Sequence, residues 1–94
     1  MELEWDESKR QRALRERGMD FADVAHFDYD TVVTWRDDRR HYGEERFNSY
    51  GYLDGLLCTY CFTVRQGRLR VISMRKCNER ERKRYEAGKN PRHA

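Results

Sequence analysis

Two short turn sequences, Asp54-Gly55 and Gln66-Gly67, constrain the fold of this chain more than any other feature. Each lies between runs that are rich in aromatic and β-branched residues, which favour strands. Asp-Gly is typical of the type I′ turn, in which two residues join two antiparallel strands. The sequence therefore predicts a meander of strands over residues 44–53, 56–64 and 69–75, and the two turns fix its register.

Helices are predicted on the N-terminal side of this meander. Asp6 can accept hydrogen bonds from the first turn of a helix over residues 7–17. That helix is expected to end at Gly18, because glycine readily adopts the left-handed conformation that closes a helix. Asp20 can cap a second, shorter helix. Residues 2–5 are predicted to form a short extended lead into the first helix.

One further strand and one further helix complete the predicted fold. The run Thr31–Trp35 is rich in β-branched residues and predicts a strand. Asn78 and Glu81 have the spacing of a capping box, which predicts the start of a helix that reaches about Ala87. We therefore expect an α+β fold with two N-terminal helices, a four-stranded antiparallel sheet and a C-terminal helix.

Composition limits the class of protein. The chain has 94 residues, of which 37% are hydrophobic and 39% charged, so it has room for one small core. We expect a single domain over residues 1–87 and a flexible tail over residues 88–94. No apolar run is long enough to cross a membrane, and the N-terminus lacks the apolar core of a signal peptide. Three cysteines, an odd number, fit a reducing compartment, so a cytoplasmic protein is expected.

The predicted register divides the side chains of the sheet between two faces. An apolar face, expected to pack against the helices, carries Phe47, Leu53, Leu56, Tyr60, Phe62, Val64, Leu69 and Val71. The opposite face carries Glu44, Arg46, Asn48, Tyr50, Tyr52, Thr59, Thr63, Arg65, Arg68, Arg70, Ile72, Met74 and Lys76. A basic face with aromatic side chains could bind single-stranded nucleic acid by charge and base stacking. A sheet face that is merely solvated is the alternative.

The cations of this chain are mostly arginine. The chain has 20 Lys plus Arg against 17 Asp plus Glu, and sixteen of the cations are arginine. The planar guanidinium can bind two phosphate oxygens at once, so this bias favours phosphate binding. Ordinary ion pairs on the surface would explain the same bias, and the net charge of +3 is too small to decide between the two.

Several motifs along the chain carry a resemblance to a known family. They are Trp5-Asp6-Glu7 with Lys9, then Gly18, Phe21, Phe27-Asp28, the run YGEERF over residues 42–47, Gly51, Thr63, Arg65, Gly67, Arg70, Ile72-Ser73, Arg75-Lys76, Glu81-Arg82 and Tyr85-Glu86. In these residues the chain resembles the BrnT family, the ribonuclease toxins of bacterial type II toxin–antitoxin pairs. The resemblance implies a RelE-like fold and an endoribonuclease that arrests growth.

The resemblance also implies partners and an alternative function. The partners are an RNA substrate, a cognate BrnA-like antitoxin, and operator DNA bound indirectly through the antitoxin complex. A homodimer is a further assembly that the sequence leaves open. Ala13, Glu16 and Arg17 stand where the family usually has Asn, Lys and His. The alternative is therefore a catalytically weakened homologue that serves as a co-repressor subunit with its antitoxin.

The proposed chemistry needs no cofactor and no metal. The 2′-hydroxyl of the RNA attacks the adjacent phosphate, so the protein must position it, move protons and neutralise the developing charge. We expect Arg65 and Arg75 to stabilise that charge, Glu44 or Glu45 to act as general base, and Tyr85 to assist. The expected contacts to the RNA backbone come from Lys9, Arg46, Arg70 and Lys76.

These candidates fall into two clusters. In an unbroken hairpin, Arg65 and Arg75 lie on opposite faces and roughly 25 Å apart. Both can serve one phosphate only if a bulge or another register intervenes. The first cluster comprises Glu44, Arg46, Arg65 and Arg70, and the second comprises Arg75, Lys76 and Tyr85.

Two further side-chain types have weaker claims. His41 is the histidine best suited to act as a general base, because His26 falls on a short helix and His93 in the tail. Cys58 and Cys61 have the spacing of half a zinc site, but on a strand residues three apart point to opposite faces. We interpret them as core thiols.

Overall fold

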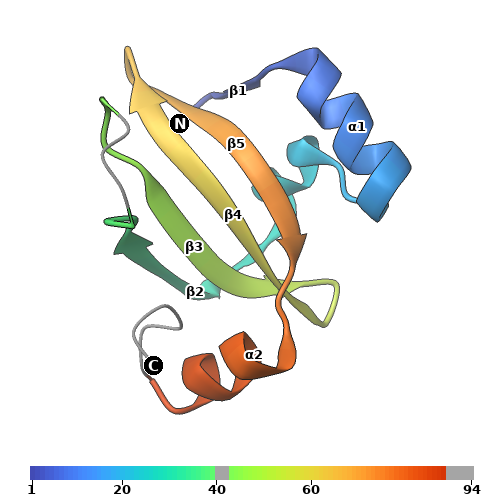
Figure 1. Cartoon of the computed structure of the whole chain (residues 1–94), viewed down its shortest axis with the longest axis vertical. Helices are drawn as coiled ribbons and strands as arrows, with labels where there is room; N and C mark the ends of the chain where they lie inside the picture. Colours follow the sequence, from blue (N-terminus) through green and yellow to red (C-terminus); the bar gives the residue numbers. More distant parts are fainter. Residues whose placement is uncertain (40–42, 89–94) are drawn as a thin grey trace.

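The computed structural model describes residues 1–39 and 43–88. The elements in chain order are β1 (Leu3–Trp5), α1 (Glu7–Arg17), the 3-10 helix η1 (Phe21–His26), β2 (Asp28–Arg36), β3 (Phe47–Leu53), β4 (Leu56–Arg65), β5 (Arg68–Lys76) and α2 (Glu79–Glu86). The strands form one five-stranded sheet in the order β1-β5-β4-β3-β2 (Figure 1). Of the tail expected over residues 88–94, residues 89–94 lie outside the described residues.

The predicted fold class was wrong in two respects. The sheet is mixed and has five strands, because Leu3–Trp5 pairs in parallel with β5 at one edge. We had expected this segment to be only an extended lead; a strand of three residues is too short to show a period of two. The second N-terminal helix is a 3-10 helix of six residues, Phe21–His26. It connects α1 to β2, and helical connectors often take the tighter 3-10 form.

The two tight turns are confirmed. Asp54 and Gly55 have φ angles of 51° and 78°, and Gln66 and Gly67 have φ angles of 52° and 75°. Positive φ at both central residues is the mark of the type I′ turn. The turns fix the pairing of Leu53 with Leu56 and of Arg65 with Arg68, as the sequence predicted.

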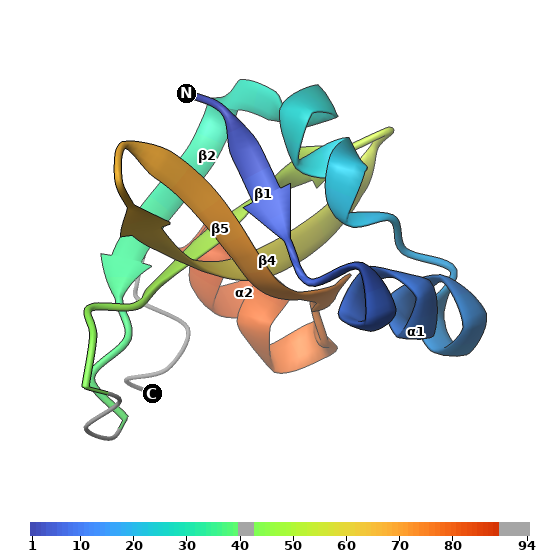
Figure 2. The same cartoon turned by 90° about the horizontal axis from the view of Figure 1, so that it is seen from above.

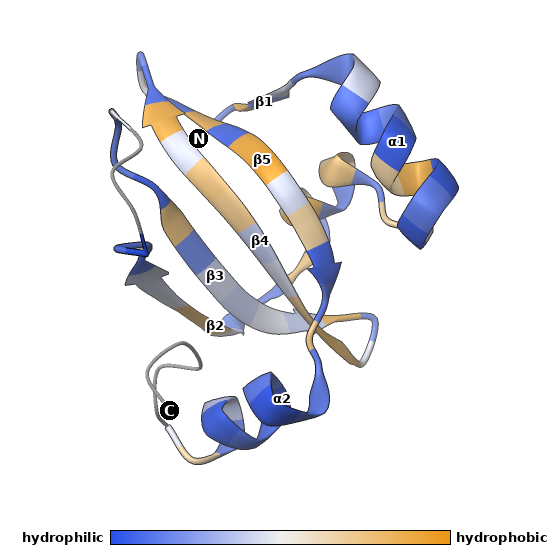
Figure 3. Ribbon diagram, in the orientation of Figure 1, coloured by the Kyte–Doolittle hydropathy of each residue, from blue (hydrophilic) through white to orange (hydrophobic). Residues whose placement is uncertain are grey.

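The hydrophobic core lies on one face of the sheet. It combines residues of α1, η1 and the segments beside them with residues of the strands: Ala13, Met19, Phe21, Val24, Phe27, Leu53, Cys58, Tyr60, Val71 and Met74. η1 covers this face, while α2 lies across the opposite one (Figure 2). Both α1 and α2 are largely hydrophilic (Figure 3), and each buries a single residue, Ala13 and Glu81 respectively. Polar contacts must therefore help to hold both helices in place.

A β-bulge in β5 changes the faces that we predicted for the end of that strand. Phe62 pairs with Val71 and Cys61 pairs with Ser73, so Ile72 is an extra residue in the ladder. Met74 therefore pairs with Tyr60 and lies fully buried in the core, whereas we had placed it on the basic face. Arg75 pairs with Thr59 and so points to the basic face, whereas an unbroken register places it on the apolar face. Lys76 turns the other way, so its predicted place on the basic face was also wrong.

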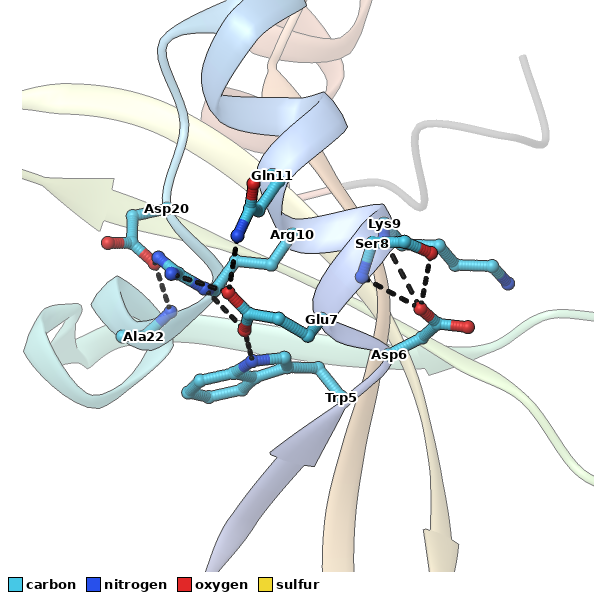
Figure 4. Close-up of polar contacts among 9 residues, drawn as sticks. All are labelled: Trp5, Asp6, Glu7, Ser8, Lys9, Arg10, Gln11, Asp20 and Ala22. Atoms are coloured by element: carbon cyan, nitrogen blue, oxygen red, sulfur yellow. Dashed lines mark hydrogen bonds and ion pairs between the residues drawn. The ribbon is translucent and has the colours of Figure 1, made fainter.

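The start of α1 is fixed by a polar network (Figure 4). Asp6 accepts hydrogen bonds from the backbone N–H groups of Ser8 and Lys9, as predicted for an N-cap. The carboxylate of Glu7 accepts from the indole N–H of Trp5, from the guanidinium of Arg10 and from the amide of Gln11. These donors lower the pKa of Glu7 to about 2, with Arg10 the main cause. The network ties β1 to α1 and so sets the position of the helix beside the sheet.

Candidate functional site

The bulge creates a polar cavity on the face of the sheet opposite the core. The cavity has a volume of about 210 Å³. It is lined by Asp37, Arg39, Arg46, Asn48, Tyr50, Thr59, Cys61, Ile72, Ser73, Arg75 and Glu81. Three arginines stand against two carboxylates in this lining, so the wall carries net positive charge. Tyr50, Asn48 and Thr59 are buried and form its floor on β3 and β4.

Arg75 reaches the cavity because of the bulge, and Glu81 fixes its orientation. Its two Nη groups donate to the two carboxylate oxygens of Glu81, each at 2.7 Å. Glu81 is 8% exposed, and it also accepts from the backbone N–H of Asn78 in the predicted capping box. The hydrogen bonds from Arg75 are the main reason that the pKa of Glu81 lies below its ordinary value.

A second arginine enters the cavity from the loop after β2. Arg39 donates to both carboxylate oxygens of Asp37, at 2.9 and 2.8 Å. The side chain of Asp37 is completely buried, and the hydrogen bonds from Arg39 lower its pKa well below the ordinary value. The backbone N–H of Asp37 donates to the carbonyl of Arg46 at 2.7 Å, which holds this loop against the start of β3.

Glu44 joins Arg46 to Arg65. Its carboxylate lies 3.1 Å from Nε of Arg46 and 2.9 Å from Nη2 of Arg65. Three members of the first predicted cluster, Glu44, Arg46 and Arg65, therefore lie together. Arg46 lines the cavity with Arg75, so the bulge brings one member of each predicted cluster to the same site. Arg65 does not reach it: Thr59, the partner of Arg75, and Arg65 are six residues apart on β4, about 20 Å at the usual strand rise.

The other predicted site residues lie outside the cavity. Arg70 donates to Glu4 at 2.8 Å and so links β5 to β1. Lys76, the residue after Arg75, points to the opposite face of β5. The hydroxyl of Tyr85 donates to the carbonyl of Thr31, and its ring packs edge-on against Tyr52.

Glu45 and Lys9 complete the predicted set. Glu45 lies 3.6 Å from Arg36 in an exposed ion pair. Lys9 is exposed on α1, beside a second groove that meets the cavity at Ile72 and Ser73. Neither residue lines the cavity itself.

The acids of this region are poor proton acceptors at neutral pH. Hydrogen bonds from Arg65 and Arg46 lower the pKa of Glu44, with Arg65 the larger cause. Asp37 and Glu81 are shifted in the same direction by Arg39 and Arg75. A carboxylate that is held as an anion by guanidinium groups binds protons weakly, so this arrangement suits positioning and charge stabilisation better than general-base catalysis.

Sequence reasoning missed Asp37 and Arg39. Both lie in a polar loop with no periodic pattern, so no local signal assigned them to a site. Asn48, Tyr50 and Thr59 were placed on the correct face, but a flat register could not show that the bulge and α2 would turn that face into a cavity.

Neither a metal site nor a membrane span is found in the described residues. Cys58 and Cys61 are both buried and point to opposite faces, as predicted: Cys58 belongs to the core and Cys61 lines the cavity. Residues 1–39 and 43–88 contain no group of three or more His, Cys, Asp or Glu side chains arranged to hold a metal ion. In the same residues no helix has the length and apolar character needed to cross a membrane. His41 and His93 lie outside the described residues.

Comparison with known protein families gives a match over most of the chain. A family model described as the ribonuclease toxin BrnT of type II toxin–antitoxin systems matches residues 5–81. The matched segment includes Trp5 at the end of β1, α1, the strands β2 to β5 and Glu81, and therefore every residue of the cavity wall. No curated protein matches the chain.

Proposed function

Because the chain belongs to the BrnT family of ribonuclease toxins of type II toxin–antitoxin systems, we propose that it is an endoribonuclease that cleaves RNA without a metal ion. The cavity between Arg39, Arg46 and Arg75 is the proposed binding site of the scissile phosphate. The observation that carries this proposal is the bulge at Ile72, which turns Arg75 to the same cavity as Arg46.

The ion pairs of the cavity orient its arginines. Of the five N–H donors of its guanidinium, Arg75 directs two to Glu81 and one to the carbonyl of Lys76. The side chain of Arg75 stays 44% exposed. Arg39 is held in the same way by Asp37, with 59% of its side chain exposed. A guanidinium held by a buried carboxylate does not have to be ordered when the substrate binds, which is the condition for strong electrostatic stabilisation.

The proposed reaction uses the RNA's own nucleophile. The 2′-oxygen forms a bond to phosphorus while the bond from phosphorus to the 5′-oxygen breaks, so the products are a 2′,3′-cyclic phosphate and a 5′-hydroxyl. Water accepts the proton of the 2′-hydroxyl and supplies the proton that the 5′-oxygen gains. Arg46 and Arg75 would neutralise the charge on the pentacoordinate phosphate. Glu44, whose pKa is lowered, would act mainly by holding Arg46.

Cleavage of RNA by the purified protein tests this proposal. We expect the wild-type protein to cut single-stranded RNA in the presence of EDTA and to leave 2′,3′-cyclic phosphate ends. Arg75→Lys keeps the charge but loses the fork, and we expect it to lower kcat by about 10²-fold, the usual effect of removing one oxyanion donor. Arg46→Gln should also lower kcat. Arg15→Gln is the control, because Arg15 is exposed on α1 and does not line the cavity.

Three results would contradict the proposal. Intact RNA with the wild-type protein would rule out the nuclease. Full activity of Arg75→Lys would show that the scissile phosphate does not bind in this cavity. Loss of cleavage in EDTA, with recovery on addition of Mg²⁺, would refute the metal-independent reaction. The melting temperature of each variant separates a loss of chemistry from a loss of folding.

The partner proposed for the chain is a protein antitoxin, since type II systems pair a toxin with one. We propose that the antitoxin is BrnA-like, that the complex binds operator DNA through the antitoxin, and that the toxin acts on RNA in the cytoplasm. Expression of this chain alone should arrest bacterial growth, and coexpression with its BrnA-like antitoxin should restore it. If expression of this chain alone leaves growth unaffected, the proposed toxin function is wrong.

A second candidate function is favoured by one observation. Arg46, Arg65, Arg70 and Arg75 all take part in ion pairs with carboxylates. Substrate must compete with those carboxylates, which would suit a catalytically weakened homologue that acts as a co-repressor subunit with its antitoxin. A wild-type protein that binds the antitoxin and operator but leaves RNA intact would identify this function.

A further inference from the structure

A groove between α1 and β5 adjoins the cavity. It has a volume of about 210 Å³ and is lined by Lys9, Arg12, Ala13, Glu16, Arg17, Phe21, Ile72 and Ser73. Ile72 and Ser73 line the cavity as well, so the two hollows meet at the bulge. β1 ends at Trp5, opposite Val71, and therefore no residue of β1 pairs with β5 at this point. A bound chain can pass from one hollow to the other across Ile72 and Ser73.

The charge of this groove differs from that of the cavity. Three cations face one carboxylate, Glu16, among the described residues that line it. Lys9 and Arg12 form no ion pair in the described part of the chain, in contrast to Arg46 and Arg75, and both are exposed. In Figure 4 the side chain of Lys9 extends away from the cluster formed by Glu7 and Arg10. The positive charge of the groove is therefore available to an anion.

The cations are arranged in a row. Lys9, Arg12 and Arg17 lie on the side of α1 that faces β5, and Lys9 and Arg17 are about 12 Å apart along the helix axis at the usual rise. Nη1 of Arg17 donates to the carbonyl of Met74 at 3.2 Å, which fixes this end of the row to the strand. Phe21 and Ile72 provide an apolar surface beneath the charges. A row of cations above an apolar surface suits the phosphates and the sugars or bases of a single strand.

We propose that this groove binds the ribose-phosphate backbone of the nucleotides next to the cleavage site. Single-stranded RNA would then lie across the bulge, with the scissile phosphate in the cavity and the flanking phosphates along Lys9, Arg12 and Arg17. This inference rests on the proposed nuclease function. Glu16 weakens binding in this groove, because its carboxylate repels the phosphates.

Binding of an uncleavable RNA tests the groove separately from the chemistry. The probe is a fluorescent 2′-O-methyl RNA oligonucleotide of about ten nucleotides, which has no free 2′-hydroxyl to attack the phosphate. Affinity is measured by fluorescence anisotropy at several salt concentrations. The variants are the double substitution Lys9→Gln with Arg12→Gln, the single substitution Glu16→Gln, and the control Arg15→Gln. Arg15 lies on the same helix, is exposed and does not line the groove.

We expect three changes. The double variant should bind on the order of tenfold more weakly, and the slope of log K against log salt should fall by about 1.4, the value for two lost phosphate contacts on a single strand. Glu16→Gln should bind more tightly than the wild type. Arg15→Gln should bind as the wild type does. In cleavage assays the double variant should raise KM by a larger factor than it lowers kcat.

Two outcomes would contradict RNA binding in the groove without contradicting the proposed nuclease function. In one, the wild type cleaves RNA, but the double variant binds the probe as tightly as Arg15→Gln does. This conclusion holds even if the double variant changes antitoxin binding. In the other, the double variant and Arg15→Gln lose affinity equally, which would assign the effect to overall charge. A wild type that binds the probe but never cleaves RNA would instead refute the proposed function. Equal melting temperatures establish that the variants are folded.

Discussion

Arg75 and Glu81 form a two-bond ion pair in which both Nη groups of the arginine donate to the carboxylate at 2.7 Å. The same carboxylate accepts from the backbone N–H of Asn78 and completes the capping box of α2. One buried side chain therefore fixes the start of the last helix and the orientation of a cavity arginine. The position of α2 and the shape of the cavity are coupled through it.

Glu81→Gln should destabilise the protein in a pH-dependent way. We expect a loss of about 1.5–3 kcal/mol at neutral pH, the range for hydrogen bonds to charged groups, measured by urea unfolding. Arg75 lowers the pKa of Glu81 in the folded state. A carboxylate whose pKa is lowered by folding stabilises the protein at pH values above its unfolded pKa, here 4.5. This stabilisation is lost as the pH falls through the pKa of the folded state. The difference between wild type and variant should therefore shrink in acid.

Glu79→Gln is the matched control for that experiment. Glu79 lies in the same turn of α2 but is exposed, and it pairs with Arg82. Exposed pairs of this kind contribute little, so its variant should unfold within about 0.5 kcal/mol of the wild type. A Glu81→Gln variant whose deficit stays constant from neutral to acidic pH would contradict the assignment.

Tyr85→Phe should lower stability and leave cleavage unchanged. The hydroxyl of Tyr85 donates to the carbonyl of Thr31, which joins α2 to β2. Removing this bond should cost about 0.5–1.5 kcal/mol of unfolding free energy. Because Tyr85 lies outside the cavity lining, kcat should stay at the wild-type value. A large loss of kcat in a stably folded variant would instead support the catalytic role that the sequence predicted for Tyr85.

Local signals predicted much of this fold. The turn Asp54-Gly55 acts through its own backbone, and the cap Asp6 acts through its side chain on the N–H groups of the next turn, so neither effect depends on distant parts of the chain. The segment Leu3–Trp5 carries no such signal. Its pairing depends on the open edge of β5, which is distant in sequence, so a local pattern could not reveal it.

The candidate site was predictable only where it follows the strand register. Glu44, just before β3, pairs with Arg65 at the end of β4, and extending the alternation of β3 backward predicted this pair. The face of Arg75 did not, because the bulge at Ile72 has no glycine or proline to mark it. One extra residue reversed every face beyond it. Helical spacing could have placed Lys9, Arg12 and Arg17 in a row, but it could not show that β5 lies on the other side of the groove.

Arg70→Gln should affect folding more than RNA cleavage. Arg70 donates to Glu4 at 2.8 Å, and both side chains are partly buried, so this pair fastens β1 to β5. We expect a loss of about 0.5–1 kcal/mol in urea unfolding. Glu4→Gln should have a similar effect, and the double variant should cost little more than either single one. A marked rise in KM for Arg70→Gln alone would show that this arginine contacts RNA.

Gly51→Ala should destabilise the sheet where β3 passes the irregular part of β2. A Cβ atom at Gly51 would lie 2.6 Å from Cγ2 of Val32 and 3.2 Å from Oγ1 of Thr31, so the neighbouring strand would have to move. Overpacking of this kind costs about 1–3 kcal/mol, which urea unfolding would measure. Adding Val32→Ala removes the closest atom and should restore part of the loss. If the double variant is no more stable than Gly51→Ala, the close contact is not the reason that glycine is needed here.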